Sequence, residues 1–139
     1  ESSGAGRDKL GEAFVRSAKR KGINDEEKLS KYKLLPLRAP IVITLITQVT
    51  EKPNVPTIEQ IQSTAAASQN ILLALYDMGY GAYWRSGPFT SATNDYISEE
   101  LSLSKESLVL GYLYVGTPTG EAKKIPELNS KEFVTYWDN

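Results

Sequence analysis

Apolar residues recur at intervals of three and four positions in the first third of the chain. This spacing predicts an amphipathic helix over residues 6–21 and a second helix over residues 24–35. Gly22 follows the first helix as a stop signal. Pro36 ends the second, because the residue before a proline is disfavoured in helical conformation. The chain therefore begins with two helices, each with one apolar face.

Two longer apolar segments follow. Residues 41–47 are rich in β-branched side chains and apolar on both faces, which predicts a central strand covered on both sides. Residues 57–78 predict the longest helix, roughly 33 Å at ~1.5 Å per residue. Its middle consists of small residues and its second half is apolar all round, a pattern typical of a buried helix. Core packing and a subunit interface both explain this composition.

The second half of the chain contains two more strand patterns. Residues 80–84 predict a short strand and residues 107–116 a longer one, in which Gly111 indicates a bulge or a close contact. A short helix is expected over residues 91–101, and a terminal strand or packed arm over residues 133–137. Helices that alternate with strands indicate an α/β or α+β protein. Because so few strands make a thin sheet, we expect further strands from a missing segment or from another subunit.

The composition narrows the possible chemistry. A length of 139 residues suits one domain with its own core, so residues 1–139 are expected to form a single domain. The chain has no His and no Cys, which excludes Ser-His-Asp and Cys-His catalysis as well as Cys/His zinc sites and iron–sulfur clusters. No metal site is expected. An enzyme of this composition would rely on a bound cofactor or on carboxylates. The adjacent pairs Glu26–Glu27 and Glu99–Glu100 fit a solvated surface best.

Charge is unevenly distributed along the chain. Residues 1–38 contain ten Lys/Arg and six Asp/Glu, whereas residues 39–139 contain six and eleven. The basic excess lies largely near the end of the first predicted helix, where it favours interaction with the helix dipole and solvent over nucleic-acid binding. The most apolar segment, residues 64–78, is interrupted by polar side chains, so no membrane span is predicted. We therefore expect no nucleic-acid or membrane partner, and a cytoplasmic protein.

The main candidate for a binding site is the segment 79–88, Gly-Tyr-Gly-Ala-Tyr-Trp-Arg-Ser-Gly-Pro. Its glycines permit sharp turns or close approach of the backbone, while Trp84 offers a planar surface and Arg85 a fixed positive charge. It is neither a Walker A motif nor a dinucleotide fingerprint, because it follows a helix and enters a strand. One interpretation is a helix cap followed by a core strand with an aromatic plug. The other is a flavin site, in which Arg85 stabilises the negative charge of a reduced ring and the amides of Ser86 and Gly87 bind ring atoms.

Lys123 and Lys124 lie shortly after the last long strand pattern. Their side chains have the charge and the length to reach a phosphate group. A pair of solvated loop charges is the simpler interpretation, and the spacing alone leaves both open.

The order of these segments resembles the FMN-dependent nitroreductase family, most closely its small, single-domain YdjA-like bacterial branch. The resemblance covers residues 5–137 and rests on motifs in a fixed order. These are Ala-Pro before the strand at residue 41, Gln-Asn-Ile-Leu-Leu-Ala in the long helix, Trp-Arg-Ser-Gly, Leu-Gly-Tyr-Leu-Tyr-Val-Gly-Thr-Pro and a final Glu-Phe-Val-Thr-Tyr-Trp.

The resemblance implies an α+β fold in which helices flank a mixed central sheet. It also implies a homodimer that has the long helix at its interface and FMN bound between the subunits. Gly116 would lie near the cofactor, and one of the two adjacent lysines would meet its phosphate. By position, the residues expected to bind the cofactor are Trp84, Arg85, Ser86, Gly87, Gly116, Lys123 and Lys124.

The activity implied by the resemblance is that of an NAD(P)H nitroreductase. NADH or NADPH would deliver hydride to FMN, and a nitroaromatic, quinone or similar small molecule would then take the electrons in ping-pong order. No side chain would act as acid or base, and Arg85 would serve as an electrostatic stabiliser of the flavin. Related flavin enzymes with other chemistry, such as reductive dehalogenation or flavin fragmentation, form a less favoured interpretation.

One departure from the family pattern leaves an alternative open. Family members begin with a helix that carries an Arg-Arg-Ser type motif for the FMN phosphate, and this sequence lacks that segment. The alternative is a non-catalytic α/β dimerisation or binding module that keeps the scaffold without flavin.

Overall fold

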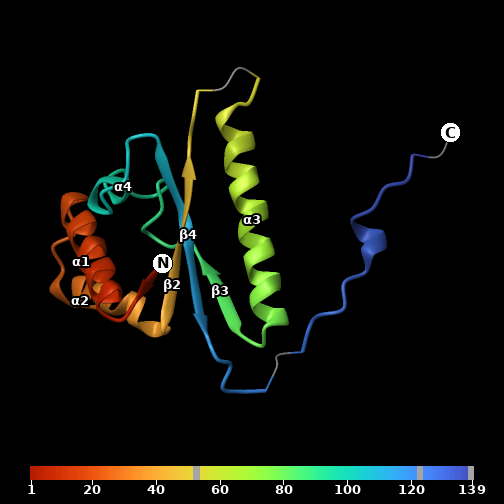
Figure 1. Ribbon diagram of the computed structural model, residues 1–139, viewed down its shortest axis with the longest axis horizontal. Helices are drawn as coiled ribbons and strands as arrows, with labels where there is room; N and C mark the ends of the chain where they lie inside the picture. The colour runs from red at the N-terminus through yellow and green to blue at the C-terminus, as the bar shows by residue number, and fades with distance from the viewer. Residues whose placement is uncertain (52–53, 122–123, 138–139) are drawn as a thin grey trace.

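A four-stranded sheet runs through the middle of the molecule in the computed structural model, which describes residues 1–51, 54–121 and 124–137 (Figure 1). In spatial order the strands are β1 (Ser2–Ser3), β2 (Ile41–Gln48), β4 (Ser107–Gly116) and β3 (Gly81–Arg85). With helices beside the sheet, this arrangement confirms the predicted α+β class. The long strand patterns at residues 41 and 107 begin as predicted.

Helices cover both faces of this sheet. One face carries α1, α2, the 3-10 helix η1 and α4, whereas α3 lies against the other face (Figure 1). A further 3-10 helix, η2, lies in the C-terminal segment, which extends away from the sheet (Figure 1). The bounds of these helices are Ala5–Arg20 for α1, Glu26–Leu34 for α2, Leu35–Arg38 for η1, Thr57–Asp77 for α3, Ile97–Glu100 for α4 and Ser130–Glu132 for η2.

Every strand pairing within the described part of the chain is antiparallel, which differs from the expected mixed sheet. The long helix α3 returns the chain along the sheet, so β3 runs in the same direction as β2. Parallel pairing of these two strands does not occur, because β4 lies between them and is antiparallel to both. The crossover thus brings the end of β3 beside the middle of the longest strand.

The feature predicted at Gly111 is confirmed as both a register shift and a close contact. The pairing of β2 with β4 shifts between Leu45 and Ile46, opposite Gly111. A Cβ atom at position 111 would lie 2.6 Å from the indole nitrogen of Trp84 and 2.9 Å from the carbonyl oxygen of Arg85. Glycine is therefore required so that β3 and β4 can approach each other at this point.

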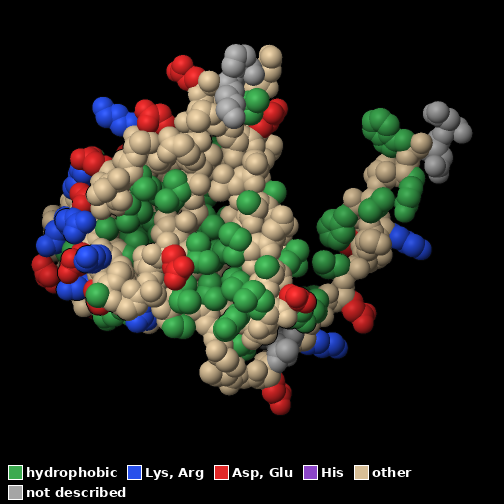
Figure 2. Space-filling view, viewed as in Figure 1, with side chains coloured by type: hydrophobic (Ala, Val, Ile, Leu, Met, Phe, Trp, Pro, Cys, Tyr) green, Lys and Arg blue, Asp and Glu red, His purple; other side chains and the backbone are tan. Residues whose placement is uncertain are grey.

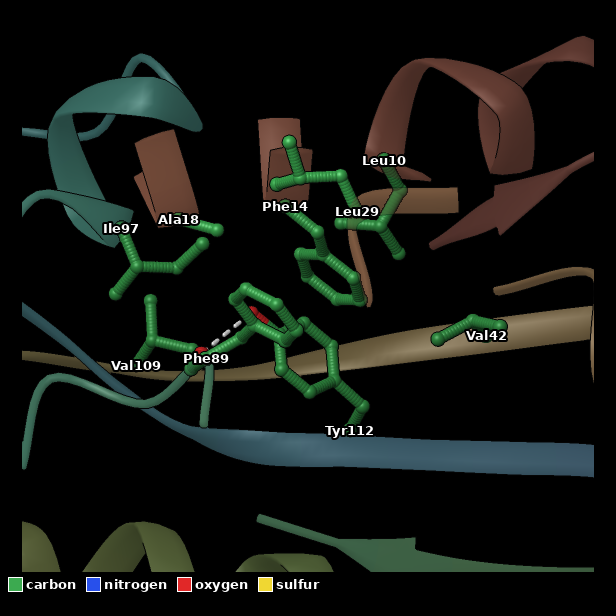
Figure 3. Close-up of a cluster of buried hydrophobic side chains, with 9 residues drawn as sticks. All are labelled: Leu10, Phe14, Ala18, Leu29, Val42, Phe89, Ile97, Val109 and Tyr112. Atoms are coloured by element: carbon green, nitrogen blue, oxygen red, sulfur yellow. Dashed lines mark hydrogen bonds between the residues drawn. The ribbon is translucent and has the colours of Figure 1, made fainter. Parts of the chain in front are cut away.

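An aromatic cluster forms the core between the sheet and the N-terminal helices. The rings of Phe14 and Phe89 are stacked with centroids 4.2 Å apart, and the ring of Tyr112 meets Phe14 edge-on at 5.1 Å (Figure 3). Such pairs contribute about 0.5–1.5 kcal/mol beyond the burial of their area. Aliphatic side chains from several elements complete the cluster, namely Leu10, Ala18, Leu29, Val42, Ile97 and Val109 (Figure 3).

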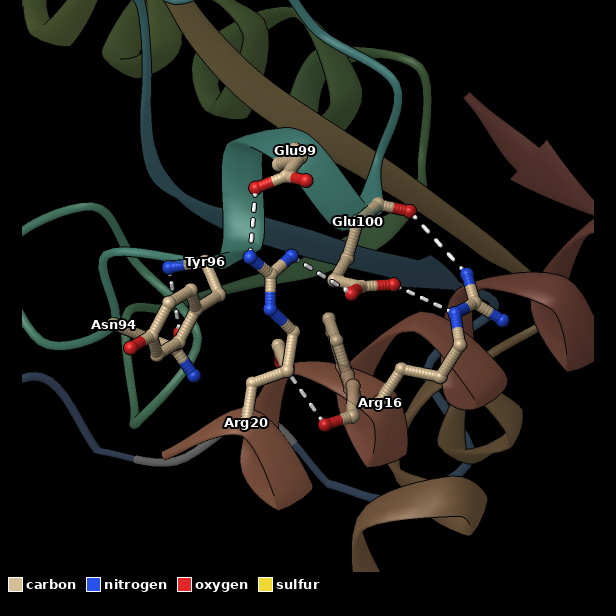
Figure 4. Close-up of polar contacts among 8 residues, drawn as sticks. Arg16, Arg20, Asn94, Tyr96, Glu99 and Glu100 are labelled. Atoms are coloured by element: carbon tan, nitrogen blue, oxygen red, sulfur yellow. Dashed lines mark hydrogen bonds and ion pairs between the residues drawn. The ribbon is translucent and has the colours of Figure 1, made fainter. Parts of the chain in front are cut away.

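The helix α4 is held to α1 by a cluster of charged side chains. Arg16 pairs with Glu100 at 2.6 Å, and Arg20 pairs with both Glu99 at 2.9 Å and Glu100 at 3.1 Å (Figure 4). The guanidinium of Arg20 also lies 4.3 Å from the centre of the Tyr96 ring. The cationic end of α1 therefore serves a packing role.

The helix α3 was predicted to be buried, and this prediction is wrong for the single chain. Only Ser68 is buried, while Leu73 and Tyr76 have 58% and 82% of their surface exposed. The side that meets the sheet packs Ile71, Leu72 and Leu75 against the smaller core cluster, and the opposite side has no cover from the described residues. Of the two explanations given for its composition, the uncovered side favours the subunit interface.

Several element ends differ from the predicted ones. The helix expected over residues 24–35 begins at Glu26, and its cap is Asp25, which accepts a hydrogen bond from the amide of Lys28. The helix expected over residues 91–101 contracts to four residues of α4. Residues 133–137 form no strand and are exposed, so the expected terminal strand or packed arm has no partner within the described chain.

Among the described residues, no helix combines the length and apolar character needed to cross a membrane.

Candidate functional site

The turn that follows β3 is anchored from both sides. Gly87 has φ +60°, in the left-handed region that glycine adopts without strain, and its carbonyl accepts a 3.2 Å hydrogen bond from the hydroxyl of Thr93. Two residues further on, the side chain of Phe89 is buried in the aromatic core, and its carbonyl accepts a 2.8 Å hydrogen bond from Tyr112 (Figure 3). The backbone around Gly87 is therefore held in place although its residues are exposed.

Trp84 and Arg85 project to opposite faces of the sheet, as neighbouring residues of a strand do. Trp84 packs beneath α3 with Leu113 and Ile71, and its indole nitrogen lies against the backbone at Gly111. Arg85 lies on the other face, where its side chain folds toward Gly87 and lines a hollow. The two side chains expected to meet one ring are thus not brought together, and only the backbone of Trp84 is near the turn.

The hollow beside Arg85 has a volume of about 740 Å³. Its lining comes from the residues that precede β2, from β3 and from the end of β4 with the loop after it. The side chains and backbone that matter most for its chemistry are those of Arg38, Tyr83, Arg85, Tyr114, Gly116 and Thr117. A hollow of this size fits a small organic ligand or part of a cofactor.

Tyr114 lines the hollow together with Arg38 and Arg85. Its partial burial raises the pKa of the phenol above its ordinary value, because the charged form loses hydration. The positive charges of Arg85 and Arg38 oppose this rise in the pKa, because they favour the phenolate form. The hollow is therefore lined by two positively charged side chains and the partly buried phenol of Tyr114.

The exposed turn offers two backbone donors. The amides of Ser86 and Gly87 make no hydrogen bond to any other part of the described chain. Pro88, the next residue, has no amide hydrogen. Free amides on an anchored turn are suited to bind the oxygen or nitrogen atoms of a planar ligand, as the sequence predicted for a flavin.

The remaining candidates differ in their relation to this site. Gly116 lines the hollow, and a Cβ atom there would lie 3.1 Å from a ring carbon of Pro40, so glycine keeps the two segments close. Lys124 is exposed on the segment after β4 and does not line the hollow. Lys123 lies outside the described residues.

Sequence reasoning missed Arg38 and the two tyrosines of the hollow. Arg38 stands just before the strand that begins at Ile41, and the antiparallel partner of Ile41 is Val115, next to Gly116. An antiparallel pairing of the two long strand patterns would have placed Arg38 near the end of β4. Strand alternation would likewise have placed Tyr83 on the same face as Arg85.

The fold and the turn after β3 define a class of protein, the nitroreductase-like α+β proteins. The structure resembles that of a nitroreductase-like family protein from Bacillus cereus with a TM-score of 0.78 and 22% identity, over 99% of this chain and 71% of that chain. It also resembles the FMN-dependent nitroreductase NfnB from Mycobacterium smegmatis, solved in complex with NADPH, with a TM-score of 0.63 and 20% identity over 98% of this chain and 76% of that chain. At these identities the likeness shows the fold.

The sequence comparison shows the family. The profile of the Nitroreductase family matches residues 2–117. The chain is 30% identical over 135 residues to the protein named "Putative NAD(P)H nitroreductase YdjA" of Escherichia coli strain K12. This match covers 96% of this chain and 72% of that protein. This chain belongs to the Nitroreductase family and is an oxidoreductase, which confirms the predicted family and enzyme class.

Proposed function

We propose that this chain is an FMN-dependent NAD(P)H oxidoreductase that acts as a homodimer with FMN at the subunit interface. The observation that carries the proposal is the anchored turn from Arg85 to Gly87, which presents a guanidinium and two free amides beside a hollow of about 740 Å³. The name of the relative YdjA and the NADPH bound to the neighbour NfnB support a nicotinamide donor. A nitroaromatic, a quinone or a similar small molecule is the proposed acceptor, and the cytoplasm is the proposed location.

The residues of this chain bind and orient the cofactor. Arg85 holds a positive charge next to the position proposed for the pyrimidine edge of the ring, and the amides of Ser86 and Gly87 donate to its polar atoms. The backbone of Trp84 fixes the start of this turn, and Gly116 keeps the neighbouring segment close. Bound FMN would supply the redox chemistry, with hydride coming from the nicotinamide and electrons going to the acceptor in ping-pong order. Lys123 and Lys124 remain the proposed contacts of the phosphate.

The proposed homodimer is supported by the apolar surface that a single chain leaves uncovered. One side of α3 exposes Leu73, Tyr76 and the small residues Ala66 and Ala67. The C-terminal segment extends away from the body, and hydrophobic side chains are exposed along it (Figure 2), namely Ile125, Leu128, Phe133, Val134, Tyr136 and Trp137. Exposed apolar patches of this kind mark protein interfaces. A second copy of the chain would cover both.

The visible spectrum of the purified protein tests the proposal directly. An FMN enzyme is expected to be yellow, or to become so after FMN is added and excess is removed. A protein that stays colourless under these conditions would instead be the binding module without flavin. Product analysis with a nitroaromatic substrate then separates nitroreduction from dehalogenation or flavin fragmentation.

The role of Arg85 is tested by the variant Arg85→Ala. We expect weaker FMN binding or a lower flavin midpoint potential, because a positive charge beside the ring is lost. Lys105→Ala is the matched control, since it removes a positive charge from an exposed turn. Unchanged affinity together with an unchanged potential in Arg85→Ala would refute the role.

A further inference from the structure

The hydrogen bonds of the segment that follows the turn converge on the hydroxyl of Thr93. Its oxygen lies 3.2 Å from the carbonyl oxygen of Gly87, 3.2 Å from the carbonyl oxygen of Thr90 and 3.1 Å from the hydroxyl of Thr90. A threonine hydroxyl has one proton to donate and two lone pairs with which to accept. These three neighbours cannot all receive that proton, and their other partners decide which of them does.

The surrounding bonds direct this proton to Gly87. Thr90 is buried, and its hydroxyl has no other partner in the described chain, so it donates to Thr93. The Thr90 carbonyl already accepts the amides of Thr93 at 3.0 Å and Asn94 at 2.9 Å. The Gly87 carbonyl accepts no other hydrogen bond from the described residues. The hydroxyl bonds therefore run in one direction, from Thr90 through Thr93 to Gly87.

Thr93 is itself held by the end of α1. The ammonium group of Lys21, the residue that caps this helix, donates a hydrogen bond to the Thr93 carbonyl. The preceding residue, Arg20, pairs with Glu99 in α4, so the segment between the turn and α4 is attached to α1 at two points (Figure 4). Because α1 packs into the aromatic core through Phe14, the Thr93 hydroxyl has a defined position relative to the sheet.

Gly87 is the residue of the turn that most needs this support. Without a side chain it adopts positive and negative φ with similar ease, whereas here it has φ +60°. The strand residue Arg85 and the buried Phe89 fix the two ends of the turn. A bond to the carbonyl between them restricts rotation of the peptide planes that carry the amides of Ser86 and Gly87.

We propose that Thr93 is a positioning residue for the flavin site: its hydroxyl, acting through the Gly87 carbonyl, keeps the amides of Ser86 and Gly87 aimed at the ligand. Thr93 does not line the hollow, so it acts through the turn and not by contact with the ligand. The inference rests on the proposed function for the identity of that ligand. The hold on Gly87 is a property of the chain without ligand and can be measured there.

Two variants separate the hydroxyl from the rest of the side chain. Thr93→Val keeps the shape and removes the hydrogen bond, whereas Thr93→Ser keeps the hydroxyl. The purified full chain, freed of bound flavin, is titrated with FMN and followed by fluorescence. We expect about fivefold weaker binding for Thr93→Val, the effect of one net hydrogen bond, and a change below about twofold for Thr93→Ser. Thr93 is exposed, so both variants should fold, which a thermal melt checks.

The flavin midpoint potential should fall in Thr93→Val only, because misdirected amides stabilise the negatively charged reduced ring less. Thr50→Val is the matched control, since it removes an exposed hydroxyl that donates a 3.4 Å hydrogen bond to Gln60 beyond the other end of β2. Parent-like FMN affinity and potential in Thr93→Val would overturn the proposal. A Thr93→Ser variant that binds FMN as weakly as Thr93→Val would overturn it as well.

The backbone dynamics of Gly87 provide a test that needs no flavin. The NMR order parameter of its amide, measured on the chain without FMN, should be about 0.85 in the parent and below about 0.6 in Thr93→Val. Thr93→Ser and Thr50→Val should resemble the parent. Equal order parameters in Thr93→Val and the parent would show that the hydroxyl does not hold the turn.

The two proposals fail in different ways. If the parent takes up no FMN but Thr93→Val loosens Gly87, the flavin function is removed and Thr93 keeps its role in positioning the turn. If the parent is yellow but Thr93→Val leaves the FMN affinity, the potential and the order of Gly87 unchanged, the flavin function is kept and the role of Thr93 is removed.

Discussion

The hydroxyl of Tyr112 donates a 2.8 Å hydrogen bond to the carbonyl oxygen of Phe89 inside the aromatic core (Figure 3). Tyr112 belongs to β4, whereas Phe89 follows the turn that carries Arg85 and Gly87. This bond therefore connects the central strand of the sheet to the proposed flavin site. Burial also raises the pKa of the Tyr112 phenol well above its ordinary value, which favours the protonated hydroxyl that donates this bond.

Replacing this tyrosine should loosen the turn. In Tyr112→Phe the ring still packs in the core, but the buried carbonyl of Phe89 loses its partner, at a cost of about 1–3 kcal/mol. We expect a lower urea midpoint and weaker FMN binding than in the parent protein. Tyr80→Phe, at an exposed position just before β3, is the control and should change the urea midpoint little. Equal midpoints for Tyr112→Phe and the parent would show that the bond contributes nothing.

Gly111 provides a second test of how β3 is positioned. The variant Gly111→Ala places a methyl group 2.6 Å from the indole of Trp84 and 2.9 Å from the carbonyl of Arg85. Because both neighbours belong to a packed strand, we expect a loss of about 1–3 kcal/mol in the free energy of unfolding and a shifted tryptophan fluorescence. Gly120→Ala has no atom within 4 Å of the new methyl group and serves as the control. A Gly111→Ala variant as stable as the Gly120→Ala variant would contradict the packing argument.

The sequence predicted which segments form helices and strands better than it predicted what those elements pack against. The strands at residues 41 and 107 were evident because β-branched and apolar runs dominate their local preference. The exposure of α3 was not evident, since an apolar helix looks the same whether a sheet or a second subunit covers it. The local pattern therefore indicates that an apolar face needs cover, but it does not indicate which partner covers that face.

Prediction of the candidate site has the same limit, because residue types identify a segment but not the residues that surround it in the fold. The segment from Trp84 to Gly87 was identified from its residue types, and strand alternation explains why Trp84 and Arg85 separate to opposite faces. Arg38 was missed because it reaches the hollow through tertiary pairing, from a position 47 residues before Arg85 in the numbering of the chain. A site built from three segments becomes visible only once the strand order is known.

The ion pair between Arg16 and Glu100 predicts a pH dependence of stability. Arg16, with help from Arg20, holds the pKa of the Glu100 carboxyl below its usual value of 4.5, despite the opposing effect of burial. A carboxylate with a lowered pKa stabilises the fold above the unfolded pKa, and this contribution is lost as the pH falls through the folded value. Since Arg16 is about half exposed, we expect at most about 1 kcal/mol at pH 7.

The variant Glu100→Gln isolates this contribution. Urea unfolding at pH 7 should show a loss of stability for Glu100→Gln, and the difference from the parent should shrink as the pH is lowered below 4.5. Glu127→Gln is the control, because Glu127 is exposed and belongs to no ion pair in the described chain. A difference between Glu100→Gln and the parent that is constant over pH would rule out the carboxylate charge as its source.

The proposed homodimer can be tested by placing a charge on the uncovered side of α3. Leu73 is 58% exposed in the single chain, so Leu73→Asp should leave the fold of one subunit intact. In a dimer packed along α3, the same aspartate would be buried without a partner, which costs several kcal/mol and should yield monomers in sedimentation velocity. FMN should be released as well, because the proposed site lies between the subunits.

Leu34→Asp is the matched control for this experiment. Leu34 is 55% exposed, but it ends α2 on the opposite face of the sheet from α3 (Figure 1). The control should therefore sediment like the parent and keep its flavin. If Leu73→Asp also remains dimeric with bound FMN, the interface does not run along α3, and the extended C-terminal segment becomes the surface to test next.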